Sequence, residues 1–327
     1  MSVNPLLSVE DLRVEFPIAS GVLGGRASGT VKAVDGVSFN LISGETLGVV
    51  GESGCGKTTT GLAILRMLSI VGGKIIFDGK DISNLTRSQM RPIRKKMQMV
   101  YQDPFGALDP RMRVRDIIGE PLIAHGEAKD KSRYRARVEE LLDIVGLDTR
   151  MGERYPHEFS GGQRQRIGIA RALALNPKLI ICDEPVSALD VSIQAQIINL
   201  LESLQKKLGL TYIFIAHDLS VVQHISDRVM VMYLGKVVEI ASHTELYQNP
   251  KHPYTQALLS AVPTPSPDAE AEREVVLLEG EVPSPLNPPK GCPFHPRCPV
   301  ARPECSVNPP EVVVDSAGHQ VSCHLFS

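Results

Sequence analysis

The sequence predicts an α/β protein with a mostly parallel core sheet, an antiparallel β subdomain near its N-terminus, an α-helical insertion and a C-terminal extension rich in proline and cysteine. Three observations predict this class. Short, continuous apolar runs end in polar residues or glycine, which is typical of strands buried on both faces. A helical apolar period appears within residues 112–155. Thirteen of the 24 prolines lie beyond residue 262.

Length and composition limit the organisation of the chain. Its 327 residues are 43% hydrophobic, so we expect a large domain over residues 1–262, with a helical subdomain at about 103–160, and a smaller extension over residues 263–327. The net charge of −2 gives no electrostatic reason to expect nucleic acid as a partner. No run approaches the roughly 20 apolar residues of a membrane span, and residues 1–10 lack the pattern of a signal peptide. We therefore expect a cytosolic protein with peripheral membrane contact.

The N-terminal region alternates short apolar segments with turn-forming residues. Leu7–Val9, Leu12–Phe16 and Val34–Leu41 are typical of strands in a small antiparallel sheet. Lys74–Phe77 leads into Asp78-Gly79, a dipeptide that favours a tight β-hairpin turn. We expect these strands to precede and flank the parallel core.

A glycine-rich loop, Gly51–Thr58, follows the apolar run Thr46–Val50 and precedes an amphipathic segment. Its three glycines allow successive backbone N–H groups to point at one phosphate, and the start of the next helix adds a partial positive charge. Lys57 can reach the outer phosphates, and the Thr58 hydroxyl can bind Mg²⁺. The alternative is a glycine-rich turn that binds nothing, but the strand before the loop and the helix after it favour a phosphate site.

The helical insertion has one clear apolar stripe. Its members recur at three- and four-residue spacing and end at Gly146, which closes the helix. They are Tyr134, Val138, Leu141, Leu142 and Val145.

A second glycine-containing helix start follows at Phe159–Gln163. Ser160 and Gln163 have the spacing of a capping box, and two glycines lie between them. Bare backbone N–H groups at a helix start could meet a phosphate, but from these residues alone an ordinary capped helix is the simpler interpretation.

Two further apolar runs end in residues that can carry chemistry. Leu179–Cys182 is followed by Asp183 and Glu184, and Thr211–Ala216 is followed by His217. Carboxylates at the end of a buried strand are unfavourable unless a positive group is near, and Mg²⁺ is the obvious candidate. The alternatives are an acidic surface turn and a structural histidine.

Position favours the functional interpretation of these residues. Gly51, Gln102, Asp183 and His217 each follow a different predicted strand. In open parallel sheets the ligand crevice lies beyond the carboxyl ends of the strands. We therefore expect the four to meet at one edge of the sheet.

These motifs together resemble those of an ABC-type ATPase, in the order of that family. The matching segments are Gly51–Thr58 (Walker A), Gln102 (Q-loop), Phe159–Gln163 (signature), Leu179–Glu184 (Walker B), Ser187–Asp190 (D-loop) and His217 (H-loop). Further segments resemble the ATP-binding subunits of oligopeptide and dipeptide importers of the peptide/nickel transporter family, and the second of their two paired ATPase types fits best. These segments are Tyr101–Pro104, the helix at Ile193–Leu200 and His252–Thr255.

The resemblance implies a role for each motif residue. Phe16 would stack on adenine, and Glu184 would act as the base, with His217 and Gln102 near the γ-phosphate. Mg²⁺ would be bound by Thr58, Gln102 and Asp183. The remaining ATP contacts would come from Gly51, Ser53, Gly54, Cys55, Gly56, Lys57, Thr58 and Thr59, and, for the ATP of the opposing subunit, from Ser160, Gly161, Gly162, Gln163 and Asp190.

The resemblance also implies partners. Two ATPase subunits would face each other, so that one Walker A loop and the partner's signature motif enclose each ATP; a heterodimer is expected. Two transmembrane permease subunits and an extracytoplasmic substrate-binding protein would complete an importer of peptides or a related small solute, with this chain on the cytoplasmic face of the membrane. Two alternatives remain open: an ABC ATPase switch that acts without a transporter, and a regulatory subunit that binds ATP without hydrolysing it.

The extension contains four cysteines, Cys292, Cys298, Cys305 and Cys323, separated by 5, 6 and 17 residues. In a reducing cytosol this cluster favours metal over disulfides. Zinc ribbons use close cysteine pairs, which are missing, whereas a four-iron, four-sulfur (4Fe-4S) cluster needs only four thiolates. The resemblance implies that cluster. Zinc with help from His295, His319 or His324, and free thiols, remain alternatives. We expect neither helices nor a regular sheet among so many prolines, and no part for the extension in hydrolysis.

Overall fold

The computed structural model describes residues 4–18, 29–103, 106–262, 276 and 278–327. The chain forms two compact units, which we describe separately. Unit 1 comprises Met1–Ile42, Thr46–Asn84 and Ala216–Ser327, and unit 2 comprises Ser43–Glu45 and Leu85–Ile215. No helix in the described ranges is long and apolar enough to cross a membrane.

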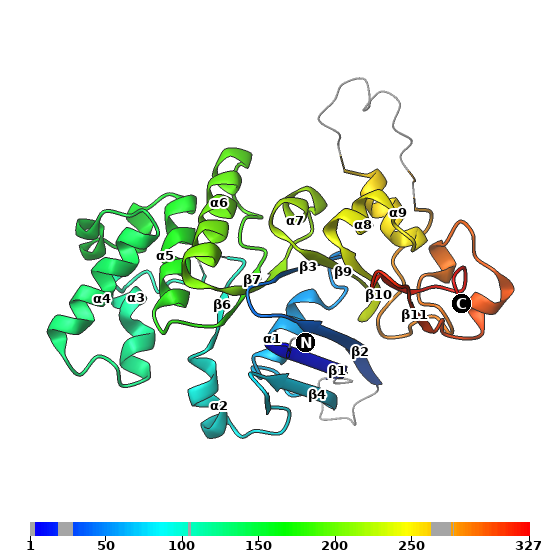
Figure 1. Ribbon diagram of the computed structural model, residues 1–327, viewed down its shortest axis with the longest axis horizontal. Coiled ribbons are helices and arrows are strands. Elements are labelled where there is room, and N and C mark those ends of the chain that lie inside the picture. Colours follow the sequence, from blue (N-terminus) through cyan, green and yellow to red (C-terminus); the bar gives the residue numbers. More distant parts are fainter. Residues whose placement is uncertain (1–3, 19–28, 104–105, 263–275, 277) are drawn as a thin grey trace. The chain divides into compact units, whose positions relative to one another are not determined.

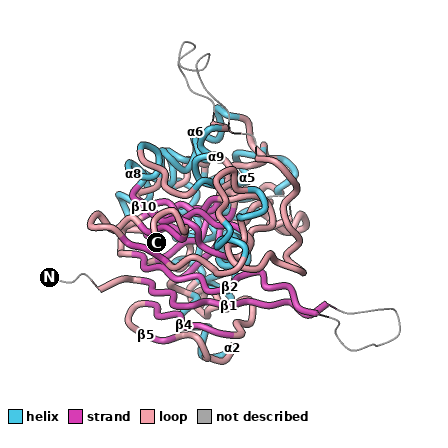
Figure 2. Tube along the Cα trace, turned by 90° about the vertical axis from the view of Figure 1, so that its right-hand side faces the viewer, coloured by secondary structure: helices cyan, strands magenta, loops and turns pink. Residues whose placement is uncertain are grey.

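Unit 1 begins with a four-stranded antiparallel sheet (Figure 2). Its strand order is β2 (Gly29–Leu41), β1 (Leu7–Ile18), β4 (Gly72–Phe77) and β5 (Lys80–Asp81). The two predicted segments before Phe16 form the single strand β1, whose register shifts where Asp11 adopts a positive φ of 48°. The predicted hairpin at Asp78-Gly79 is confirmed, since both residues have positive φ and β4 pairs with β5.

A second sheet of unit 1 carries the glycine-rich loop. Here β3 (Thr46–Val50) pairs in parallel with β9 (Arg228–Tyr233), which pairs antiparallel with β10 (Lys236–Ser242). All five residues of β3 are buried, as predicted for a strand covered on both faces. Four helices complete this part of the unit: α1 (Lys57–Ile64), α7 (Leu219–Ile225), α8 (His243–Gln248) and α9 (Pro253–Ser260).

The C-terminal extension joins this sheet, which corrects the expectation that it would form no regular sheet. Strands β11 (Val312–Val314) and β12 (Gln320–Ser322) form a hairpin, and β12 pairs with β10 through Glu239 and Val321. The physical reason is local: the last proline is Pro310, so the backbone beyond it keeps all its donors. The cysteine-bearing part before the hairpin contains only the short 3₁₀ turns η3 (His295–Arg297) and η4 (Pro303–Ser306).

Unit 2 combines three parallel strands with a helical region (Figure 1). The strands lie in the order β8 (Thr211–Ile215), β7 (Leu179–Asp183) and β6 (Met97–Val100). Its helices are α2 (Arg87–Arg94), α3 (Val114–Ala124), α4 (Lys131–Ile144), α5 (Gly161–Leu173) and α6 (Val191–Leu208), with 3₁₀ turns η1 (Thr149–Glu153) and η2 (Pro156–Glu158). Helices α3, α4 and α5 pack on one another.

The apolar period predicted the buried face of α4, except that Tyr134 is only half-buried. Val138, Leu141 and Leu142 are the buried residues of α4. Helix α6 ends at Gly209, whose φ of 66° is the left-handed conformation that favours glycine. The predicted α/β class, with an antiparallel N-terminal sheet, parallel core strands and a helical insertion, is thus confirmed.

Candidate nucleotide-binding site

The glycine-rich loop of unit 1 connects β3 to α1. Gly51, Gly54 and Gly56 all have positive φ, of 145°, 79° and 104°. A Cβ atom at Gly51 would lie 2.2 Å from the carbonyl oxygen of Met232, and one at Gly56 would lie 2.3 Å from that of Ala33. Since backbone cannot yield as a flexible side chain does, only glycine fits at these two positions.

Lys57 occupies the first helical position of α1 and is 6% exposed. Its ammonium group donates to the carbonyl oxygens of Gly51, at 2.7 Å, and Glu52, at 3.0 Å. The loop therefore holds the lysine over its own backbone, while Ser53, Gly54 and Thr58 are exposed and Thr59 is half-buried. The N-cap residue of α1, Gly56, has no side chain to cap the helix. This is the arrangement expected of a loop built to accept an anion.

Residues distant in sequence hold the loop from outside. The Gly235 N–H donates to the Cys55 carbonyl oxygen at 2.9 Å, and the Glu52 N–H donates to the Tyr254 hydroxyl at 2.9 Å. The Arg297 guanidinium binds the Glu52 carboxylate. Sequence reasoning assigned none of these residues to the loop, although Tyr254 lies in the segment His252–Thr255 that resembles the importers.

His217 and Phe16 also belong to unit 1. The N–H of Ala216 donates to the Val49 carbonyl oxygen at 3.1 Å, so the backbone next to His217 lies beside the end of β3. His217 is exposed. Phe16 pairs with Val31 in β1 and β2 and is 40% exposed. Its predicted contact with adenine stays a prediction.

Unit 2 brings three predicted site residues together. Asp183 ends β7 and is only 4% exposed. Glu184 follows it, and its carboxylate accepts a 2.7 Å hydrogen bond from the Gln102 side-chain amide. Glu184 has a positive φ of 43°, a strained conformation for a residue with a side chain, and its N–H donates to the Ile215 carbonyl oxygen at 2.9 Å. Backbone strain of this kind clusters at functional sites.

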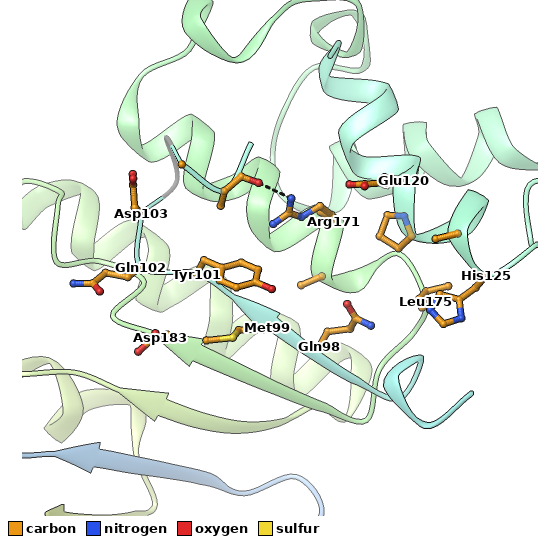
Figure 3. A pocket seen from close by; sticks show the side chains of 15 residues that line it. Gln98, Met99, Tyr101, Gln102, Asp103, Glu120, His125, Arg171, Leu175 and Asp183 are labelled. Carbon is orange, nitrogen blue, oxygen red and sulfur yellow. Dashed lines mark hydrogen bonds between the residues drawn. The ribbon is translucent and has the colours of Figure 1, made fainter. Parts of the chain in front are cut away.

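A pocket of about 710 Å³ adjoins these residues in unit 2. Figure 3 shows Gln102 and Asp183 at one end of the pocket, Tyr101 near its middle, and Glu120 and His125 farther along. The Arg171 guanidinium donates to the Ala107 carbonyl oxygen at 2.6 Å and lies 5.8 Å from the centroid of the Tyr101 ring. The pocket thus has a polar end beside the Asp183 and Glu184 carboxylates. In its wall, the Arg171 guanidinium binds the backbone at Ala107.

The second glycine-containing helix start, in unit 2, is the capping box that the sequence predicted. The Ser160 N–H donates to the Gln163 side-chain oxygen at 3.0 Å, and the Gln163 N–H donates to the Ser160 hydroxyl at 3.4 Å. A Cβ at Gly162 would lie 2.5 Å from Ile193 Cγ2, so this glycine allows α5 to approach α6. Asp190 caps α6 through the Ile193 N–H.

Comparison with known proteins decides which family these features belong to. The ABC transporter model matches residues 34–187, and the model of the oligopeptide/dipeptide transporter C-terminal region matches residues 238–305. The oligopeptide transport ATP-binding protein AppF of Bacillus subtilis is 58% identical over 98% of each chain. A second oligopeptide transport ATP-binding protein, OppF of Salmonella typhimurium, is 55% identical over 97% of this chain and 95% of its own. This chain belongs to the ABC ATPases of oligopeptide transporters.

Solved structures support the assignment of this chain to the ABC ATPases. An ATP-binding cassette described as a dimer in a post-hydrolysis state with ADP and Pi is 27% identical, with a TM-score of 0.64, over 72% of this chain and 98% of its own. CbiO1 of Clostridium perfringens, described as part of an ABC transporter complex, is 29% identical with a TM-score of 0.64, over 75% of this chain and 92% of its own.

The four cysteines of the ABC ATPase extension line one small cavity in unit 1. Cys292, Cys298, Cys305 and Cys323 are free thiols and surround a space of about 10 Å³, room for about one water. Burial raises the pKa of the Cys292 thiol to about 11. Across the described residues, no three His, Cys, Asp or Glu side chains converge closely enough to hold a metal.

His252 also lines this cavity, and sequence reasoning did not assign it a role there. Its Nδ1 accepts the Tyr254 N–H at 3.0 Å, and burial lowers the pKa of the ring to about 3, so the neutral ring carries its proton on Nε2. That Nε2 is buried and has no hydrogen-bond partner. A donor without an acceptor therefore lies in the wall of a cavity lined by four thiols.

Proposed function

We propose that this ABC ATPase subunit hydrolyses ATP to power the import of oligopeptides, dipeptides or a related small solute. The observation that carries the proposal is the placement of Glu184: it follows the buried Asp183, is held in a strained backbone conformation, and is oriented by a 2.7 Å hydrogen bond from Gln102. A carboxylate fixed in this way is suited to orient a water and take its proton. The intact Glu184 and His217 favour hydrolysis over mere nucleotide binding.

The remaining residues bind and position the nucleotide. The uncapped N-terminus of α1 and the positive φ of three glycines favour phosphate binding by the 51–56 backbone, and Lys57 would exchange its carbonyl partners for phosphate oxygens. Phe16 would stack on adenine. Ser160, Gly161, Gly162, Gln163 and Asp190 would serve the ATP bound by the opposing subunit.

The chemistry of Thr58, Asp183 and Gln102 fits Mg²⁺. Asp183 offers a buried carboxylate at the end of β7, and Thr58 offers an exposed hydroxyl in the first turn of α1. Protein sites for Mg²⁺ commonly use one or two carboxylates, with phosphates and waters as the other ligands. When bound, the ion would neutralise charge on the β- and γ-phosphate oxygens.

We infer that the subunit works in an assembly. Its self-capped signature helix would meet the ATP of a second ABC ATPase, most simply in a heterodimer, and two transmembrane permeases with an extracytoplasmic substrate-binding protein would complete the importer. The chain would then lie against the cytoplasmic side of the membrane. The 710 Å³ pocket supports this: Gln102 lines it and also holds Glu184, so a permease segment in the pocket could influence the base.

Replacement of Glu184 tests the proposed hydrolysis. Glu184→Gln should keep MgATP binding and lower ATP turnover of the assembled complex on the order of 10²–10⁴-fold, because the amide cannot take a proton. It should also trap the closed ATPase dimer, which size-exclusion chromatography with ATP would detect. Glu140→Gln, which removes an exposed carboxylate paired with Arg137, is the control. Normal turnover by Glu184→Gln would contradict the assignment, and recovery of wild-type protein from native membranes without permeases would favour the transporter-free switch.

We propose, in addition, that the four cysteines bind a metal, with a 4Fe-4S cluster as the first assignment and zinc as the alternative. The donor set fits: four reduced thiols line one cavity, and the orphaned His252 Nε2–H could donate to a thiolate or sulfide there. The spacing fits less well, since ligation would have to rearrange the thiols around a larger group.

Metal analysis of anaerobically purified protein separates these alternatives. A 4Fe-4S cluster predicts brown protein with about four iron and four sulfide per chain, lost in Cys298→Ser. Colourless protein with one zinc would replace the cluster by zinc. Protein without metal would contradict both.

A further inference from the structure

The turn between the first two cysteines, which contains η3, lies against the Walker A loop in unit 1. Arg297, the residue before Cys298, places both terminal nitrogens of its guanidinium on the Glu52 carboxylate, at 2.8 and 3.1 Å. The Arg297 side chain is 7% exposed and that of Glu52 is 27% exposed. A planar, bidentate, half-buried ion pair of this kind is among the stronger polar contacts in proteins.

The same turn also supports the loop through aromatic rings. Phe294 is 1% exposed, and its ring centroid lies 5.3 Å from those of Tyr233 and Tyr254. The Tyr254 hydroxyl in turn accepts the Glu52 N–H. Glu52 is therefore held twice, at its side chain by Arg297 and at its backbone by the tyrosine that Phe294 packs against.

Glu52 is a junction of the phosphate loop. Its carbonyl oxygen accepts the Lys57 ammonium at 3.0 Å and the Cys55 N–H at 3.3 Å. A shift of Glu52 would therefore displace the lysine and the curl of the loop together. Its carboxylate is also a negative charge in a loop that must receive polyphosphate, and Arg297 neutralises it.

Backbone hydrogen bonds of cysteine residues brace the turn that carries Arg297. The Cys292 N–H donates to the Cys305 carbonyl oxygen at 2.8 Å, and the Cys298 N–H donates to that of His295 at 3.3 Å. The start of the turn that carries Phe294 and Arg297 is thus tied to Cys305, and its end closes on His295 within the turn. Because Arg297 and Cys298 are neighbours in the chain, a displacement of Cys298 would also displace Arg297.

We propose that Arg297 is a positioning residue of the nucleotide site, and that through it the state of the cysteine group sets how firmly the Walker A loop is held for MgATP. The inference rests on the proposed ATP-binding function. It revises the expectation that the extension is independent of the ATP site, because the two are in direct contact. The extension acts on the geometry and charge of the loop and does not touch the reacting atoms.

Two measurements on the full-length subunit test the role of Arg297: the dissociation constant of MgATP and hydrogen exchange of residues 51–56. Arg297→Gln should weaken MgATP binding about tenfold, since a charge-assisted contact is lost and Glu52 keeps its charge unpaired. Exchange in the loop should become faster. Arg297→Lys keeps the positive charge but lacks the planar guanidinium. Its MgATP affinity and loop exchange should therefore lie between those of the wild type and Arg297→Gln. Arg297→Gln with wild-type affinity and exchange would overturn the proposal.

Two further variants separate positioning from general loosening of the extension. Asp315→Asn removes the 2.6 Å ion pair with Lys251, another tie of the extension that does not touch the loop, and should leave MgATP affinity unchanged. Adding Glu52→Gln to Arg297→Gln should recover most of the affinity, because the unpaired charge is gone. An equal loss in Asp315→Asn, or no recovery in the double variant, would contradict the assignment.

The link to the cysteines has its own readout. Cys298→Ser should accelerate exchange of residues 51–56 in the wild-type background and add little in Arg297→Gln, since the connection is already broken there. Equal acceleration in both backgrounds would show that Arg297 does not carry the coupling. Wild-type protein that fails to bind MgATP would instead overturn the proposed function itself, so the two failures are distinguishable.

Discussion

The two glycine-containing helix starts, at α1 and α5, solve the same local problem in opposite ways. Helix α1 begins at Lys57, after the N-cap residue Gly56, which has a left-handed conformation with φ 104° and no side chain to cap the helix. Helix α5 begins after Ser160, in an extended conformation with φ −66° and ψ 164°, and its Ser160 and Gln163 cap each other. The start of α1 has no side chain at its N-cap position, whereas the start of α5 is closed by its own side chains.

The glycines differ in the same sense. Gly51 and Gly56 of the Walker A loop face backbone carbonyls of Met232 and Ala33, so they are required for the loop to exist at all. Gly161 faces the side chain of Leu189, and Gly162 faces that of Ile193 in α6, so Gly162 sets how closely α5 and α6 pack. A phosphate site built from backbone depends on backbone packing, whereas the capped start of α5 depends on side chains. Three experiments sharpen this comparison.

The largest effect should follow from a methyl group at the start of α1. Gly56→Ala adds an unfavourable left-handed conformation and a clash with the Ala33 carbonyl oxygen, and should weaken MgATP binding about 100-fold through misplacement of the loop. Gly54→Ala is the matched control: its φ is also positive, at 79°, but nothing lies within 4 Å of the added carbon. It should therefore weaken binding far less. Calorimetric titration measures the MgATP affinity of both variants. Equal losses of affinity would mean that the clash with the Ala33 carbonyl oxygen is not the cause.

An intermediate effect should follow from removal of the cap on α5. Ser160→Ala should destabilise unit 2 by about 1 kcal/mol. Thr86→Ala is a close structural twin, because Thr86 and Gln89 form the same reciprocal pair on α2, at 2.9 and 3.4 Å. Both variants should shift urea unfolding similarly, but only Ser160→Ala should lower ATP turnover of the assembled complex, by roughly 3- to 10-fold. Equal turnover in the two variants would remove the signature role of Ser160.

The smallest effect should have the opposite sign. Gly168 lies inside α5, and a Cβ there would meet nothing within 4 Å. Gly168→Ala should therefore stabilise the isolated subunit by about 0.5–1 kcal/mol, because alanine loses less backbone entropy in a helix. Gly162→Ala, which meets Ile193 Cγ2 at 2.5 Å, should destabilise it. Urea unfolding of both variants measures the difference in their stability. Destabilisation by Gly168→Ala would contradict the expectation that a Cβ at this position meets no other atom.

Short-range sequence patterns were enough to predict the local elements and the family. Apolar runs located β3, β7 and β8 within a residue, the stripe of α4 was read from its period, and the Ser160 capping box was predicted from spacing alone. These features are local, since each depends on residues within about one or two turns of chain. The order of the motifs identified the ABC ATPase family, which the comparisons confirmed.

The distant residues that support the site become apparent when the folded chain is seen. Gln102 reaches Glu184 across 82 positions, and Arg297 reaches Glu52 across 245. Neither pair follows from a spacing rule, because the contacts depend on how strands and loops are stacked, and a lone arginine in a proline-rich segment looks like any solvated charge. The sheet strands of the extension were missed for the converse reason: an average over many prolines hid a short segment that has none. Local patterns specify elements, whereas long-range contacts depend on packing that no short stretch encodes.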